Sequence, residues 1–238
     1  MSSHSEKGHA KNVANFETEI SFCTAYGTAY NPSKQSITIT ALNELLQQSR
    51  TALNEVTREK NTYDLAVNER KIVFSTLKPT ATRLINALDV TDASYETVAD
   101  AKSINKKIQG GRTSAKPSED EDKKTISTSQ QSYDSLVENF SKLLDLIALE
   151  PSYAPNEEEL RIDTLNQYVE KLRSTNLIVI ETYTVYSNSM ISRDNVMYAE
   201  KSGMVNTALE VKKYVKSVFG ATSPQFKQVS KLEFSRPR

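Results

Sequence analysis

The sequence predicts an all-α protein, and three observations support this fold class. The chain of 238 residues has only 6 glycines and 7 prolines, so few turns interrupt it. Apolar residues recur three and four positions apart over long stretches, which is the period of a helix with one buried face. The stretches that begin at Leu42 and Leu165 run for about 35 residues without glycine or proline, enough for a helical rod of about 50 Å. We therefore expect few, long helices.

An internal repeat predicts how these helices are organised. Tyr30-Asn-Pro32 matches Tyr153-Ala-Pro155 at an offset of 123, and Val13-Ala-Asn-Phe16 matches Val137-Glu-Asn-Phe140 at an offset of 124. The same register continues through the pairs Ile39/Ile162, Leu42/Leu165, Arg50/Arg173, Tyr63/Tyr186, Arg70/Arg193 and Val73/Val196. Self-similarity of this kind indicates a duplicated structural unit. We predict two tandem three-helix repeats.

The predicted boundaries follow from a polar, charged segment between the copies. The first three-helix repeat spans residues 1–111, a polar linker spans 112–128, and the second three-helix repeat with a basic C-terminal tail spans 129–238. The linker does not require two independent domains. The copies either form separate domains or pack as one elongated helical bundle with long central helices.

The first helix of each copy is short, with predicted ranges of 8–26 and 129–149. The residues at helical spacing that predict its buried face are Val13, Phe16, Ile20 and Cys23 in the first copy and Val137, Phe140, Leu144 and Ile147 in the second. Because Cys23 takes the place of Ile147, we interpret it as a buried, inert thiol.

The second helix is the long one, and Asn156 followed by three glutamates predicts where it starts in the second copy. Its seam, at alternating spacings of four and three, is mostly apolar with polar interruptions such as Asn176, as in a helix packed lengthwise against neighbours. Tyr183 belongs to the same seam. Arg70 and Arg193 share one seam position. We interpret them as arginines whose stems pack and whose heads meet a carboxylate or a helix C-terminus, rather than as paired anion or partner sites.

The third segment contains turn signals. In the first copy we predict a break at Lys78-Pro79, a cap at Asp92 for a further piece, and a stop at Gly110-Gly111. In the second copy the segment runs to Gly220. Ser223-Pro224 then predicts one more short helix, followed by an extended tail.

Composition excludes several classes of chemistry. The sole cysteine, Cys23, excludes an intramolecular disulfide and a cysteine-based zinc site. The two histidines, His4 and His9, lie in a polar stretch that we interpret as a solvated tail rather than a weak metal site with Glu6. The chain has no Glu-x-x-His pair of a di-iron bundle and no glycine-rich phosphate motif. We therefore predict that it is not an enzyme, with no catalytic residue, no cofactor, no metal and no small-molecule substrate.

Several features predict a cytoplasmic protein without a membrane span. Thirty Lys and Arg balance thirty Asp and Glu, which argues against a surface built as a whole for nucleic acid or anionic lipid. The N-terminal stretch lacks the apolar core of a secretory signal. The most apolar run, Leu177-Ile-Val-Ile180, is far shorter than a bilayer requires.

Residues 201–238 carry the main charge asymmetry, with eight Lys or Arg against Glu210 and Glu233. Basic residues with interleaved aromatic rings can bind nucleic acid or an anionic surface. Because the lysines are dispersed and no nucleic-acid fold is recognisable, we favour a solvated helix face or contact with the acidic body of a neighbouring copy over nucleic acid. The residues that we predict to bind a partner are Lys212, Lys213, Lys216, Phe226, Lys227, Lys231, Phe234 and Arg236.

Two segments carry a resemblance to known proteins. They are the opening Gly8–Phe16 and the ending Tyr214–Phe234, with Lys107-Ile-Gln-Gly110 and Tyr153–Glu158 extending the likeness over most of the chain. The sequence resembles a group of uncharacterised helical proteins of Bacteroidota bacteria, for which no activity is known. The resemblance implies a bacterial origin and a helical build, and it transfers no functional residue.

The leading functional interpretation is a non-enzymatic structural, scaffold or protein-interaction module whose partners include a second copy of the chain. Long helices expose much lateral surface, and opposite charges on body and end favour association. The alternative is binding of nucleic acid or an anionic surface through the basic C-terminal segment. A third class, an enzyme or small-molecule binder, requires a pocket with buried carboxylates or an apolar cavity. A helical pore is disfavoured because no segment is apolar enough.

Overall fold

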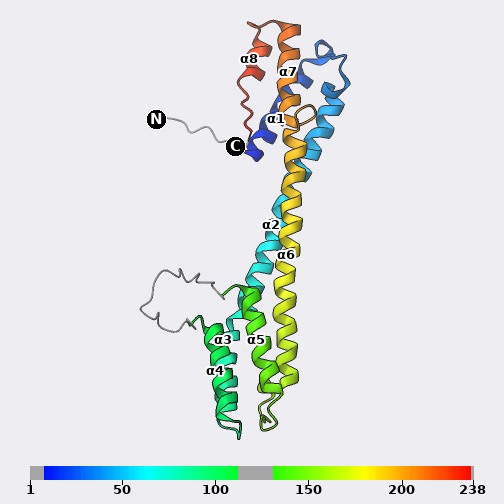
Figure 1. Ribbon diagram of the computed structural model, residues 1–238. Coiled ribbons are helices and arrows are strands. Elements are labelled where there is room, and N and C mark those ends of the chain that lie inside the picture. Colours follow the sequence, from blue (N-terminus) through cyan, green and yellow to red (C-terminus); the bar gives the residue numbers. More distant parts are fainter. Residues whose placement is uncertain (1–7, 112–130, 237–238) are drawn as a thin grey trace, which may run out of the picture. The chain divides into compact units, whose positions relative to one another are not determined.

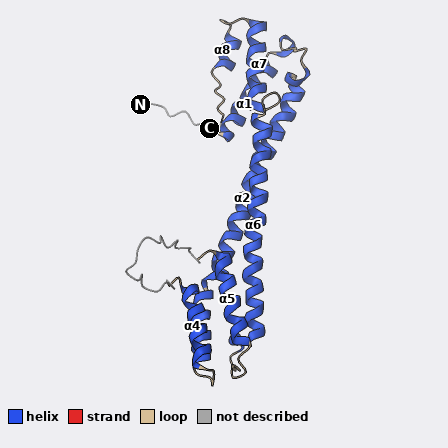
Figure 2. Ribbon diagram, in the orientation of Figure 1, coloured by secondary structure: helices blue, strands red, loops and turns tan. Residues whose placement is uncertain are grey.

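The computed structural model describes residues 8–111 and 131–236, and over these residues it contains helices, turns and loops but no strand (Figure 2). This confirms the all-α prediction. The predicted linker, 112–128, lies outside the described residues. The α-helices are α1 (His9–Ala25), α2 (Ile39–Ser75), α3 (Leu77–Asp89), α4 (Tyr95–Gln109), α5 (Tyr133–Ala148), α6 (Ile162–Tyr198), α7 (Met204–Phe219) and α8 (Pro224–Ser230), and the 3₁₀ turns are η1 (Gly27–Ala29), η2 (Gln35–Ile37) and η3 (Glu158–Leu160).

The chain divides into two compact units. Unit 1 comprises Met1–Thr62 and Tyr183–Arg238, and unit 2 comprises Tyr63–Thr182. The long helices α2 and α6 therefore contribute to both units. Each unit takes segments from both predicted copies. The boundaries of the compact units therefore differ from the boundaries of the predicted repeats.

Unit 1 is built around α1 and α7, with α8 packed against both of them (Figure 1). Phe16 and Val215 are fully buried in its core, and Cys23 is 1% exposed. The prediction of a buried thiol is confirmed. Burial raises the pKa of Cys23 to about 12, so the reactive thiolate is scarce at neutral pH.

Unit 2 is built around α3, α4 and α5, with α4 packed against both of the others. The first part of α6 adds Leu165 and Leu172 to the same core, and Phe140 from α5 is fully buried within it. Phe140 contacts Tyr168 edge-on at 5.8 Å between ring centroids, a favoured arrangement of two aromatic rings.

The long helices α2 and α6 each contain 37 residues and begin at Ile39 and Ile162. A 3₁₀ turn precedes each of them, closed by a hydrogen bond from a buried tyrosine. The Tyr30 hydroxyl donates to the Ile37 carbonyl at 2.7 Å, and the Tyr153 hydroxyl donates to the Leu160 carbonyl at 2.9 Å. The prediction that α6 starts after Asn156 is therefore wrong, because residues 158–160 form the 3₁₀ turn and the α-helix begins only at Ile162.

Each half of the sequence contains four α-helices in its described part, where three were expected. After α2, the chain forms α3 and α4 as separate helices. The predicted break lies earlier than Lys78-Pro79, after Ser75, and Pro79 lies in the first turn of α3, where a missing N–H costs no helical hydrogen bond. The stop at Gly110 is confirmed, since Gly110 adopts a φ of 87°.

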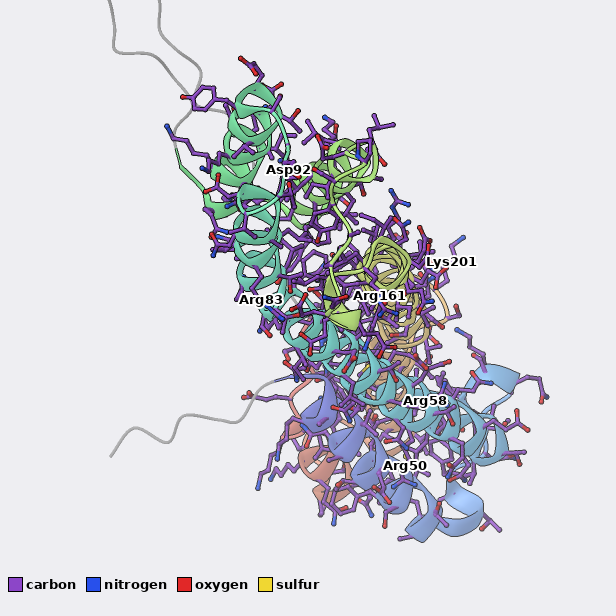
Figure 3. All side chains as sticks on the ribbon, turned by 90° about the horizontal axis from the view of Figure 1, so that it is seen from below. Arg50, Arg58, Arg83, Asp92, Arg161 and Lys201 are labelled. Carbon is purple, nitrogen blue, oxygen red and sulfur yellow. The ribbon has the colours of Figure 1, made fainter. Side chains whose placement is uncertain are left out.

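Ser94, rather than the predicted Asp92, caps α4. The Ser94 side chain accepts a hydrogen bond from the Thr97 backbone N–H at 3.1 Å. Asp92, labelled in Figure 3, lies in the turn between α3 and α4, too early in the chain to reach those N–H groups. The predicted start of α8 is confirmed, with Ser223 as its cap and Pro224 in its first turn.

Removing the α4 cap is expected to destabilise unit 2 modestly. Ser94→Ala leaves the Thr97 N–H without its acceptor, which lowers the free energy of unfolding by about 1 kcal/mol. Thermal denaturation followed by circular dichroism measures the change. Ser94→Asp keeps an acceptor at the cap and serves as the control. Equal melting temperatures for the alanine variant and the parent would contradict this role.

Candidate functional site

A groove lies between α5 and α6, which run side by side within unit 2 (Figure 1). It encloses about 660 Å³. Its lining residues are Asp134, Val137, Glu138, Ser141, Lys142 and Asp145 from α5 and Arg173, Asn176, Leu177 and Ile180 from α6. A second hollow shares Ser141, Asp145 and Arg173 and continues along α6 to Asn166.

Apolar side chains form one wall of the groove. Leu177 is 54% exposed and Ile180 is 55% exposed, on successive turns of α6. Val137 lies beside them and is buried. Single exposed apolar residues are common on protein surfaces, but neighbouring ones that line a concave surface are typical of an interaction site.

Charged residues of both signs form the rim. Lys142 pairs with Glu138 at 2.6 Å, and Arg173 pairs with Glu170 at 2.7 Å. The hydrogen bond and positive charge of Lys142 lower the pKa of Glu138. These pairs are exposed to solvent, so they add little to stability but give the rim a defined charge pattern.

A partly buried polar network supports the end of the groove. Asn176 is 7% exposed; its amide donates to the Asp134 carboxylate at 2.6 Å and accepts from the Arg70 guanidinium at 2.7 Å. The guanidinium of Arg70 lies 3.9 Å from the centre of the Tyr133 ring. These contacts hold the first turn of α5 against α6. The contacts of Arg70 are typical of an arginine with a structural role.

Arg193, the predicted counterpart of Arg70, lies in unit 1 and also meets a polar partner. Its guanidinium pairs with the Asp194 carboxylate at 2.8 Å. The predicted carboxylate partner is therefore found at Arg193, whereas the prediction is wrong at Arg70, whose head meets an amide and an aromatic ring instead of a carboxylate or a helix end. The seam prediction is wrong at Tyr183, whose side chain is 53% exposed.

The predicted partner-binding residues belong to unit 1, where several of them contact one another. Lys212 lies 5.0 Å from the Phe234 ring, and Lys216 lies 5.6 Å from the Phe226 ring. Arg236 donates to the Asn206 amide oxygen at 2.8 Å. The residues of the set that stay exposed are Lys213, Lys216, Lys227, Lys231 and Arg236. The basic segment thus uses Lys212, Phe226 and Phe234 for contacts within the chain.

His9 is not part of a solvated tail, contrary to the prediction. It is the first residue of α1, it is half-buried, and its Nδ1 lies 2.7 Å from the Tyr198 hydroxyl. Burial lowers the pKa of His9, as does the charge of Arg193. His4 and Glu6 lie outside the described residues.

The described residues contain no cluster of three or more His, Cys, Asp or Glu side chains that could hold a metal ion. None of the described helices combines the length and the apolar character that a membrane-spanning helix requires. In comparisons with known proteins, no family model, curated protein or solved structure matches the chain. The fold defines an all-α protein, and the resemblance to the Bacteroidota group stays a prediction.

Proposed function

We propose that this protein is a non-enzymatic interaction module that associates with a second copy of itself through the α5–α6 groove. The exposure of Leu177 and Ile180 on the groove wall carries the proposal. Covering these side chains removes apolar surface from water, and this is the main driving force of association.

The charges of the rim favour a second copy as the partner. Asp134 and Glu138 give one part of the groove a negative charge, and the other part carries Lys142 and Arg173 against the single carboxylate of Asp145. In a twofold symmetric dimer the same surface meets itself in the reverse direction. The acidic part of one groove then faces the basic part of the other, which favours this pairing over a parallel one.

We also infer that the chain consists of two tandem repeats with four helices each. The equal lengths of α2 and α6, and their starts at the positions paired by the predicted register, support a duplication. The tyrosine-closed turns before both helices support it as well. A duplicated module that exposes lateral helix surface suits a scaffold role.

The proposed association is tested by charging the apolar wall. Leu177→Glu combined with Ile180→Glu is expected to weaken self-association at least roughly tenfold, since the few residues that dominate an interface lie near its centre and contribute more than about 1 kcal/mol each. Sedimentation velocity over a range of concentrations measures the dissociation constant. Leu65→Glu, which changes a residue that is 70% exposed in unit 2 but does not line the groove, is the matched control.

Two results would contradict the proposal. One is a parent chain that stays monomeric at high concentration, whatever the salt concentration. The other is a double variant that associates as tightly as the Leu65→Glu control.

A further inference from the structure

Side chains of α1 hold an extended segment of unit 1 through hydrogen bonds to the backbone of that segment. Residues 232–236, which we call the strap, follow α8 without helical structure. The Asn12 amide donates to the Ser235 carbonyl at 2.7 Å and accepts from the Ser235 N–H at 3.0 Å. The Asn15 amide donates to the Glu233 carbonyl at 2.7 Å. Two side-chain amides of α1 thus bind the strap much as a neighbouring β-strand binds a peptide.

Side chains of α7 and a backbone carbonyl of α6 hold the two ends of the strap. Lys212 of α7 donates to the Leu232 carbonyl and lies over the Phe234 ring at 5.0 Å. At the other end, Arg236 donates to the Tyr198 carbonyl at 3.2 Å and to Asn206 at 2.8 Å. We call Asn12, Asn15, Tyr198, Asn206 and Lys212 the strap-binding face.

Beneath the strap-binding face, Glu19 of α1 is completely buried, and neither of its carboxyl oxygens has a hydrogen-bond partner. Lys212, whose positive charge acts on Glu19, donates a hydrogen bond to the strap.

We propose that the strap-binding face accepts the strap of a second copy in place of its own. Most of the hydrogen bonds go to backbone atoms, so they form equally well whichever chain supplies the strap. Exchange of an identical segment recreates the same contacts between chains, which is a low-cost route to a dimer. The chain's own strap is tethered and has the advantage of a high local concentration, so exchange is observed best when that advantage is removed.

Two full-length variants remove the advantage of the chain's own strap. In the face variant, Asn12→Ala and Asn15→Ala delete the amides that bind the strap. In the strap variant, Phe234→Ala and Ser235→Pro delete the ring under Lys212 and the N–H bound by Asn12. Both carry Leu177→Glu and Ile180→Glu, so association through the α5–α6 groove does not contribute. The intact strap of the face variant can then bind the intact face of the strap variant.

The expected result is a 1:1 heterodimer on mixing, at least tenfold tighter than the self-association of either variant, measured by analytical ultracentrifugation. A mixture that behaves as the sum of its parts would overturn the proposal. If circular dichroism shows that the face variant is unfolded, Asn15→Ala alone replaces it, because Asn15 is half-buried and makes a single bond to the strap.

Energy transfer between full-length chains provides a second measurement. Cys23 is buried, so a cysteine introduced as Thr18→Cys on α1 or as Glu233→Cys on the strap can be labelled selectively. With Leu177→Glu and Ile180→Glu present, transfer that rises with concentration and is lost on adding Asn12→Ala supports exchange. Transfer that is insensitive to Asn12→Ala argues against it. If exchange fails, the proposal of association through the α5–α6 groove still stands, since the two sites are tested separately.

Discussion

Phe140→Ala is expected to lower the free energy of unfolding of unit 2 by about 3–5 kcal/mol. The ring is fully buried and packs edge-on against Tyr168, and alanine leaves a cavity that the neighbouring helices cannot fill completely. Phe16→Ala is expected to cost a similar amount in unit 1, because Phe16 is equally buried and occupies the paired position of the predicted repeat.

Hydrogen exchange followed by mass spectrometry can locate these losses. Phe140→Ala should increase exchange mainly in α3–α5, and Phe16→Ala mainly in α1 and α7. Leu149→Ala, at a residue 84% exposed, is the control and should change stability by less than about 0.5 kcal/mol. A small effect at one phenylalanine and a large effect at the other would contradict the equivalence of the two positions.

Glu19→Met is expected to stabilise unit 1 at pH 7 by about 1–3 kcal/mol, because it replaces a buried carboxyl group without partners by an apolar side chain of similar size. Burial raises the pKa of Glu19 well above its ordinary value of 4.5. The folded state therefore holds a proton that the unfolded state releases. Stability from this group is present below pH 4.5 and is lost as the pH rises through the folded-state pKa.

Urea denaturation at several pH values tests this prediction. The parent should lose stability relative to Glu19→Gln as the pH rises above 4.5, since the amide does not titrate. Glu17→Gln is the matched control, because Glu17 lies on the exposed side of α1 and pairs with Arg50 at 2.6 Å. A parent and a Glu19→Gln variant with the same pH dependence would show that the buried carboxyl does not control stability.

Helices were predictable because their signals are local. The buried face of α1 follows from Phe16, Ile20 and Cys23, whose spacing brings them to one side of any helix. Glycine and serine–proline signals likewise marked the end of α4 and the start of α8. The start of α6 was missed because the hydrogen bond from the buried Tyr153 to Leu160 depends on packing against the core, which no local signal reports.

The candidate site was predictable only in part. Leu177 and Ile180 are conspicuous in the sequence, but a helix can bury or expose such residues depending on which neighbours cover that face. Asn176 was visible as a polar interruption in an apolar seam, and that signal could have identified the network with Arg70 and Asp134. Glu19 carried a similar signal, three positions after Phe16 and four before Cys23 on the buried face of α1.

The sequence alone determined the helical class, several helix ends such as those of α1 and α4, and the buried faces of the short helices, since these depend on contacts between residues a few positions apart. Only the tertiary structure decided that α2 and α6 each serve two compact units, that the strap lies on α1, and that the α5–α6 groove leaves Leu177 and Ile180 exposed. Such features depend on pairs of residues far apart in the chain, for example Asn12 and Ser235. Their choice of partner is governed by packing and has no periodic trace in the sequence.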